Sequence, residues 1–285
     1  MISIIVCCRN SDIQQSLKSN IEKTIGVEYE LIIIDNSLQK HSIFSAYNLG
    51  VKKAKFPYLC FMHDDILYHT HDWGIKVIEN FQDKNVGLIG IMGAHYLPRK
   101  PAYWFDSIKS ENLILTNNNF SEKIYRNYYS KGSDYTEAVV CDGIWICILK
   151  RLFDEVKFDD KTYQGFHFYD MDISMQILEK GYSVRIINNV LIEHFKASEL
   201  DKSFYDNEKL FFEKWKSVLP ITKGASVDDS CKMIIDNYCD LKLHYHDLWE
   251  DRNKIISSKA YRIGRLILKP LKFIKKIDYM KSPKQ

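Results

Sequence analysis

Short runs of apolar, β-branched residues alternate with helix-length segments through the first ninety residues of the chain. Strands are predicted over 3–7, 30–34, 58–62 and 86–91, and helices over about 10–24, 43–55 and 70–81. Strands that are separated by helices indicate βαβ units, in which the strands run parallel and the crossovers are right-handed. The sequence therefore predicts an α/β fold with a mostly parallel, Rossmann-like sheet flanked by helices.

The pattern becomes less regular after about residue 95. The stretch 95–135 is aromatic and polar without clear periodicity, so we expect a loop-rich insertion or cap there. Further strands are predicted over 138–141, 144–149, 184–187 and 190–192, and a helix over 170–180 that ends at Gly181. Beyond about residue 200 the pattern is helical. We therefore expect two domains, an α/β domain over 1–205 and a helical C-terminal extension over 206–285.

The composition is that of a soluble globular protein, with 46% apolar and 27% charged residues. Seven cysteines without a Cys-x-x-Cys pair disfavour a zinc ribbon or a thioredoxin-type site and fit a reducing cytosol. No apolar run approaches the ~18 residues of a membrane span. The N-terminal segment also lacks the basic region and the cleavage site of a signal peptide. We therefore expect a cytoplasmic protein.

The net charge of +3 is unevenly distributed along the chain. Arg252–Gln285 contains eleven Lys or Arg residues and one acid, a charge of +10, which leaves −7 for the first 251 residues. Apolar residues between Ile256 and Ile274 recur at helical spacing, and basic residues follow the same spacing on another face. A basic amphipathic helix lies in the interface of an anionic membrane, so we expect peripheral attachment to the inner face of the cell membrane. The alternative is a helix that packs on the acidic body; nucleic-acid binding is disfavoured.

Polar residues follow three of the predicted strands. These strand ends read Cys7-Cys8-Arg9-Asn10, Asp35-Asn36-Ser37 and His63-Asp64-Asp65. In sheets of this kind, ligands bind beyond the carboxyl ends of the strands. The adjacent carboxylates Asp64 and Asp65 suit Mg²⁺ or Mn²⁺, which also bridge phosphate oxygens, although a solvated turn explains them equally well. Asp35 either accepts a hydrogen bond from a base or ribose, or forms an ordinary Asx-turn.

A second group of candidate residues lies in the later part of the chain. Asp170 and Asp172 occur in GFHFYDMDIS at the start of a predicted helix, where acids also interact favourably with the helix dipole. An aromatic setting would raise a carboxyl pKa and make one of them a general base. Helical spacing places the two on different faces, so one of them is expected to point into a site. His194 follows a short strand, where it is either structural or a ligand.

These segments together resemble the family-2 glycosyltransferases with a GT-A fold. The resemblance covers about residues 1–200 and is carried by five motifs in the family's order: SIIVCCRN, IIIDNS, AYNLGVKKAKFPYLCFMHDD, FDDKTYQGFHFYDMDISMQILEKGY and EHFKAS. The GFHFYD segment is most similar to a bacterial subgroup linked to capsule and surface-polysaccharide synthesis. The resemblance implies a GT-A-like domain that binds a nucleotide sugar.

The family's nucleotide-binding roles would fall on four residues here. The resemblance implies that Asp35 binds the nucleobase and that the turn of Cys8 and Arg9 lies against the nucleotide. Asp64 would contact the ribose or the base. The implied donor is a nucleotide-diphosphate sugar, with a UDP-sugar favoured.

The remaining roles concern the metal and the transfer itself. The resemblance implies that Asp65 and His194 bind Mn²⁺ or Mg²⁺, and that Asp170 deprotonates the acceptor hydroxyl. Asp142 and Gly143 would line the pocket for the donor sugar and the acceptor. The sequence departs from the family's pattern at two positions: the metal motif begins with His63 rather than Asp, and Tyr169 stands where Glu is common.

The implied reaction is an inverting transfer of a sugar to a hydroxyl of a glycan or a lipid-linked acceptor in bacterial surface-polysaccharide synthesis. A sugar-nucleotide nucleotidyltransferase is an alternative, but such enzymes resemble one another in a Gly-rich loop after the first strand, where this chain has Cys-Cys-Arg-Asn. A non-catalytic, membrane-associated binding domain is the other alternative.

Overall fold

The computed structural model describes residues 1–116, 122–128, 133–195, 202–224 and 228–263. The chain divides into two compact units, Met1–Asp236 and Asn237–Gln285. In the described part of the chain, no helix combines the length and the apolar character that crossing a membrane requires.

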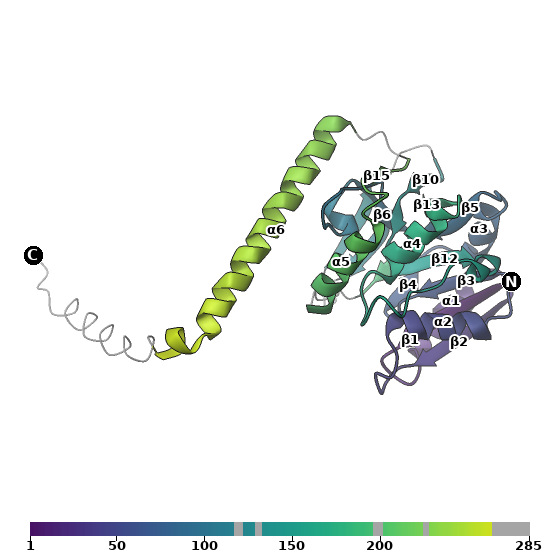
Figure 1. Cartoon of the computed structure of the whole chain (residues 1–285). Helices are drawn as coiled ribbons and strands as arrows, with labels where there is room; N and C mark the ends of the chain where they lie inside the picture. The colour runs from purple at the N-terminus through teal and green to yellow at the C-terminus, as the bar shows by residue number, and fades with distance from the viewer. Residues whose placement is uncertain (117–121, 129–132, 196–201, 225–227, 264–285) are drawn as a thin grey trace, which may run out of the picture. The chain divides into compact units, whose positions relative to one another are not determined.

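A seven-stranded sheet forms the centre of the first unit, in the order β10-β13-β5-β12-β3-β1-β2 (Figure 1). Its strands are β1 (Ile2–Cys8), β2 (Tyr29–Asp35), β3 (Tyr58–Met62), β5 (Val86–Gly90), β10 (Tyr135–Ala138), β12 (Trp145–Leu149) and β13 (Ser183–Ile187). Strands β1, β2, β3, β5 and β13 run in one direction, whereas β10 and β12 run in the other. This arrangement confirms the predicted α/β fold with a mostly parallel sheet.

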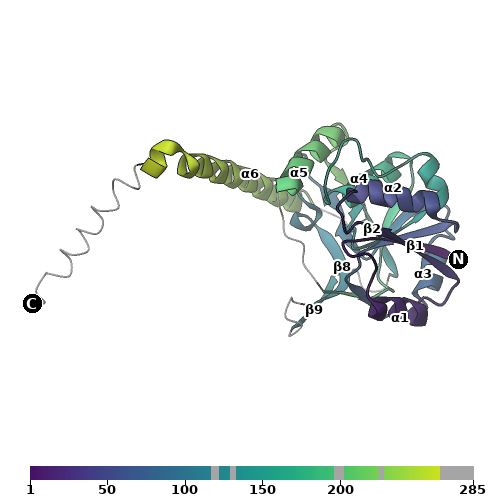
Figure 2. The same ribbon diagram turned by 90° about the horizontal axis from the view of Figure 1, so that it is seen from below.

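Four helices cover this sheet. They are α1 (Gln15–Thr24), α2 (Ile43–Lys53), α3 (Trp73–Asn80) and α4 (Tyr169–Glu179). Figure 2 shows α2 and α4 on one face of the sheet and α1 and α3 on the other. Because both faces are covered, β1 is almost entirely buried and reads as a continuous apolar run rather than as an alternating one.

Helix α1 begins five residues later than the sequence predicts. Asp12 accepts hydrogen bonds from the backbone N–H of Ile13 and from Lys18, and Gln14 precedes the helix in an extended conformation. An acidic side chain that bonds to nearby backbone competes with helix formation. Residues 10–14 therefore form a turn that leads from β1 into the helix.

A second, six-stranded sheet takes two of its strands, over 109–116 and 123–128, from the stretch 95–135, for which the sequence predicts a loop-rich insertion or cap. Its order is β11-β6-β8-β14-β4, with β9 paired to β8. The strands are β4 (Ile66–Tyr68), β6 (Met92–Ala94), β8 (Lys109–Thr116), β9 (Lys123–Tyr128), β11 (Val140–Cys141) and β14 (Ile192–His194). Strand β8 is hard to recognise in the sequence because four of its buried residues are polar: Ser110, Glu111, Asn112 and Thr116. Asn112 is satisfied by donating to the carbonyls of Asn188 and Val190, at 3.0 and 2.8 Å.

The C-terminal part contains two helices and one short strand. Helix α5 (Lys202–Trp215) adds Phe204, Phe211 and Trp215 to the core of the first unit. Strand β15 (Ile221–Thr222) pairs with β7 (Tyr96–Leu97), and α6 (Asp229–Ser257) follows. Most of the predicted basic amphipathic helix, over 264–285, lies outside the described residues.

Candidate active site

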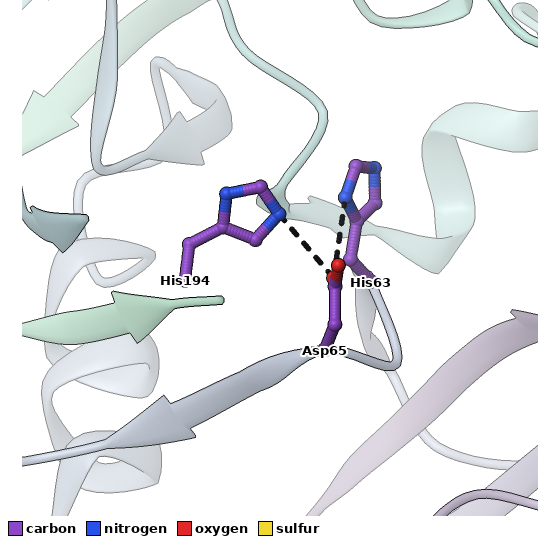
Figure 3. Close-up of side chains that lie close together, drawn as sticks. All are labelled: His63, Asp65 and His194. Atoms are coloured by element: carbon purple, nitrogen blue, oxygen red, sulfur yellow. Dashed lines mark ion pairs between the residues drawn. The ribbon is translucent and has the colours of Figure 1, made fainter. Parts of the chain in front are cut away.

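Three residues with metal-binding side chains meet where β3, β4 and β14 end or begin. His63 follows β3, Asp65 precedes β4, and His194 is the last residue of β14. Strand β14 pairs with β4 so that His194 lies opposite Ile66, the neighbour of Asp65. Asp65 Oδ1 is 3.3 Å from His194 Nε2 and 3.9 Å from His63 Nδ1 (Figure 3). All three ligand atoms lie within 4.8 Å of one another.

The ring of His63 is oriented by a hydrogen bond on its far side. Its Nε2 is 3.1 Å from the Tyr169 hydroxyl, which donates its own proton to the Gly143 carbonyl at 3.0 Å. A hydroxyl has one proton, so Tyr169 must accept the proton that His63 carries on Nε2. The other nitrogen, Nδ1, is then unprotonated and faces Asp65, which is the tautomer that a metal ion requires.

Gly143 packs directly against the same tyrosine. A Cβ atom at this position would lie 2.1 Å from the Tyr169 hydroxyl and 2.3 Å from its ring. At these distances the buried ring or the backbone would have to shift to admit a methyl group. Position 143 therefore requires glycine as long as Tyr169 is present.

The charges of His63 and Asp65 also fit a divalent cation. Burial and the nearby His194 lower the pKa of His63 to about 4, so its ring is neutral at pH 7. Burial raises the pKa of Asp65, but the hydrogen bond and charge of His194 outweigh this effect and bring it below its usual value. Metal ligands must be deprotonated in this way. Two imidazoles and one carboxylate suit a divalent transition-metal ion better than Mg²⁺.

Asp170 is a buried carboxyl group, 3% exposed, at the N-terminal end of α4. It accepts hydrogen bonds from the backbone N–H of Gly143 at 2.8 Å and of Met171 at 2.9 Å. Burial, and then the negative charge of Asp142, raise the pKa of Asp170 to about 7. Asp142 itself accepts from Ile144 N–H and Trp104 Nε1, both at 2.8 Å. A carboxylate with this pKa is suited to general-base catalysis near neutral pH.

One cavity of about 350 Å³ connects these groups. It brings together four of the predicted site residues, namely Asp142, Gly143, Asp170 and His194. His63 and Tyr169 line it as well, and the aromatic side chains in its wall are those of Tyr103, Trp104, Phe105 and Phe166. The predicted base, one predicted metal ligand and the predicted sugar-pocket residues therefore line one cavity.

The opposite wall of the cavity is formed by alternate residues of β8. Lys109, Glu111, Leu113 and Leu115 face it, together with Arg126 from β9. Glu111 is 3% exposed, and its Oε1 lies 3.4 Å from Arg126 and 3.7 Å from Lys109. Within the described ranges, no group donates to its Oε2. This wall therefore combines two cations with a buried carboxylate that has unused acceptor capacity.

The predicted nucleotide-binding residues Cys8, Arg9, Asp35 and Asp64 are not among the residues that line this cavity. Burial and the nearby carboxylate of Asp64 raise the pKa of the Cys8 thiol to about 12, and burial and Asp65 raise the pKa of Asp64. The Arg9 guanidinium is 5.9 Å from the centre of the Phe166 ring. Asp35 is exposed and accepts from Ser37 N–H at 2.9 Å, as an Asx-turn does. Its role in binding a nucleobase stays a prediction.

Asp172 is on a different face of α4 from Asp170, as the helical spacing predicts. Its carboxylate is 1% exposed and accepts from Trp215 Nε1 at 2.8 Å and from Tyr163 Oη at 3.1 Å. Lys214 Nζ lies 2.9 Å away. Asp172 thus joins α4 to α5 and has a structural role.

His63 is the member of this candidate metal site that the sequence analysis did not predict. It stands two positions before Asp65, in the motif His-Asp-Asp, and was treated there only as a departure from the family's pattern. A histidine and an aspartate that are separated by one residue directly after a strand can both reach the same ion. This spacing is the sequence signal that could have predicted a role for His63.

Comparison with known proteins supports the same fold and family. Residues 3–215 match the profile of a family described as "Glycosyltransferase like family". A crystal structure of GalNAc-T7 with UDP, GalNAc and Mn²⁺ matches with a TM-score of 0.52 at 13% identity. The match covers 92% of this chain but 57% of the GalNAc-T7 chain, so this chain spans little more than half of that protein's length.

A197 from STIV also matches, with a TM-score of 0.41 and 11% identity over 69% of this chain and 86% of that one. No curated protein matches the sequence. The likeness to GalNAc-T7 shows a GT-A-like α/β fold, and the profile match covers most of the sequence. The chain therefore belongs to the glycosyltransferase-like family.

Proposed function

We propose that this protein is a metal-dependent, inverting glycosyltransferase that uses a UDP-sugar as donor. The observation that carries the proposal is the single cavity lined by His63, His194 and Asp170, with Asp65 completing the metal site. A metal-dependent sugar transfer with a protein base needs both a metal site and a positioned carboxylate. Here residues of both line the same cavity. The GalNAc-T7 structure contains UDP and Mn²⁺, which supports the same donor class and the same ion for this chain.

Each residue of the cavity has a defined task in this proposal. Asp170 accepts the proton of the acceptor hydroxyl as that oxygen attacks the anomeric carbon, and Gly143 N–H holds its carboxylate in place. His63, Asp65 and His194 would hold the ion, which supplies neutralisation of the charge on the leaving diphosphate. Tyr169 keeps His63 in the tautomer that binds metal.

The acceptor is proposed to be a glycan or a lipid-linked sugar of a bacterial surface polysaccharide. Tyr103 and Trp104 provide apolar surface for a sugar ring, and Glu111 Oε2 can accept a hydroxyl hydrogen. On the donor side, Asp35, Arg9 and the neighbouring Cys8 and Asp64 are proposed nucleotide contacts. The basic segment 252–285 is proposed to attach the enzyme to the inner face of the cell membrane.

The test is a screen of nucleotide sugars with Mn²⁺ and sugar acceptors, followed by release of nucleoside diphosphate. We expect UDP release that requires Mn²⁺ and disappears in Asp170→Asn, whereas UDP binding by that variant persists. Pyrophosphate release from a nucleoside triphosphate would instead identify a nucleotidyltransferase. Binding of UDP and Mn²⁺ without any turnover across the donor panel would identify a non-catalytic binding domain.

A further inference from the structure

Helix α6 has an apolar seam that follows a seven-residue repeat. Ile234, Leu241, Leu248 and Ile255 recur every seventh residue, and Tyr238 and Tyr245 stand four residues after the first two of these. The six side chains are between 49% and 69% exposed. We call these six residues the α6 seam, and we propose that it binds the α6 seam of a second copy of the chain in a two-stranded coiled coil.

The repeat length favours a coiled coil over packing against a globular surface. Apolar residues at spacings of three and four, repeated every seven, form the narrow a/d stripe of a coiled coil, whereas a helix that packs on a globular core has a wider apolar face. The aliphatic residues Ile234, Leu241, Leu248 and Ile255 occupy the d positions, and the tyrosines occupy a positions. Leucine stands at the two central d positions, the residue that parallel two-stranded coils use there.

The exposed area is close to what a dimer needs. From their exposed fractions, the six side chains expose roughly 700 Å² per chain, compared with ~800 Å² per partner in a standard protein–protein interface. The helix runs for 29 residues, so two copies could pair over several turns. In the described part of the chain these side chains are largely exposed, and contiguous apolar patches of that size are uncommon on monomeric proteins.

The charge of the helix argues against a lipid surface as the occupant. Between Asp229 and Asp251 it carries six acids and two lysines, a net charge of −4. Interfacial membrane helices place Lys and Arg beside their apolar face, and anionic headgroups would repel this one. This part of α6 differs in that respect from the basic segment that begins at Arg252.

The experiment is sedimentation velocity of the full chain from low to high micromolar concentration. We expect a species of twice the 33.6 kDa chain mass. Leu241→Glu should raise the dimer dissociation constant by about 100-fold or more, because it would bury an unpaired charge at the seam. Met233→Glu is the matched control: it places the same charge on an equally exposed residue of α6 that lies off the seam, and it should leave the dimer intact.

Circular dichroism should show unchanged helix content in both variants, since both positions are exposed. A monomeric chain at every concentration would overturn the proposal, as would equal effects of the two substitutions. If Leu241→Glu lost binding to anionic vesicles but sedimented with the same mass as the unmodified chain, the α6 seam would be assigned to a lipid surface instead. UDP binding and turnover are measured on the same samples, so failure of the dimer is distinguishable from failure of the proposed enzymatic function.

Discussion

His63 and Tyr169 are hydrogen-bonded to each other, with 3.1 Å between Nε2 and the hydroxyl oxygen. They are also the two positions at which the sequence departs from the pattern of the glycosyltransferases that it resembles. The two departures are therefore in direct contact: His63 stands where the family has an acid in the candidate metal site, and Tyr169 orients its ring. The Gly143 carbonyl completes the chain of hydrogen bonds.

The first prediction concerns this orienting contact. Tyr169→Phe should weaken Mn²⁺ affinity by about 10-fold or more, because hydrogen-bond partners behind metal ligands contribute that much. Isothermal titration of Mn²⁺ in the presence of UDP measures it. Tyr163→Phe is the matched control, since it removes a buried hydroxyl that contacts Asp172 and is remote from the ion. Equal affinities in the two variants would show that Tyr169 only fills space.

The metal site itself gives the second prediction. Asp65→Ala should abolish Mn²⁺-dependent UDP binding, because it removes the one carboxylate of the cluster and leaves only the two imidazole rings. His194→Ala should raise the Mn²⁺ concentration for half-maximal activity without abolishing it. The neighbouring Asp64→Ala should leave that concentration unchanged. Unaltered Mn²⁺ dependence in Asp65→Ala would contradict the assignment of the site.

The third prediction addresses the base. Asp170→Asn should reduce the turnover rate by roughly 10²–10⁴-fold, the usual contribution of a general base. The amide keeps the size of the side chain, so UDP–Mn²⁺ affinity should remain as in the unmodified protein. Steady-state kinetics and calorimetry on the same preparation separate the two effects. A variant that transfers sugar at the normal rate would exclude Asp170 as the base.

The pH dependence of turnover follows from the same residue. A base must be deprotonated, and the pKa of Asp170 is about 7, so the rate should rise with pH through about 7 and then level off. The negative charge of Asp142 contributes to this raised pKa. Asp142→Asn should therefore move the rise to lower pH, while burial keeps the pKa of Asp170 above its ordinary value. A rise that stays in place or moves to higher pH would refute this coupling.

Stability provides the fifth prediction. Asp172→Ala should lower the free energy of unfolding by about 3 kcal/mol, because it leaves the buried donors Trp215 Nε1 and Tyr163 Oη without this acceptor. Lys214 keeps its ion pair with Asp159. Urea unfolding measures the change. Asp206→Ala removes an exposed carboxylate that pairs with Lys202 on α5, and should change stability little. Similar losses in both variants would mean that the contacts of Asp172 add nothing to stability.

The strands that alternate with helices could be predicted from local pattern alone. Strand β3 occupies Tyr58–Met62 as predicted, because a fully buried parallel strand reads as an uninterrupted apolar run. The stretch 138–141 was predicted as one strand, but its residues belong to β10 and β11, which lie in different sheets. Local hydrophobicity does not indicate which of two sheets a strand joins.

Of the candidate site, the sequence predicted Asp65, Asp170 and His194, which stand beside strand or helix ends. It did not predict the position of Glu111, because a buried glutamate inside a strand has no local signature. The tautomer of His63 was equally beyond prediction, since it depends on Tyr169, more than a hundred residues away in the chain. Contacts between distant segments decide such details.

The close fit of Gly143 against Tyr169 has an evolutionary consequence. Any side chain at 143 collides with the tyrosine, so a lineage that carries Tyr169 cannot accept even alanine there. A change at 169 alone would in turn leave His63 without its orienting partner. Substitutions at the three positions can therefore accumulate only in a restricted order, and homologous sequences should show positions 63, 143 and 169 changing together rather than independently.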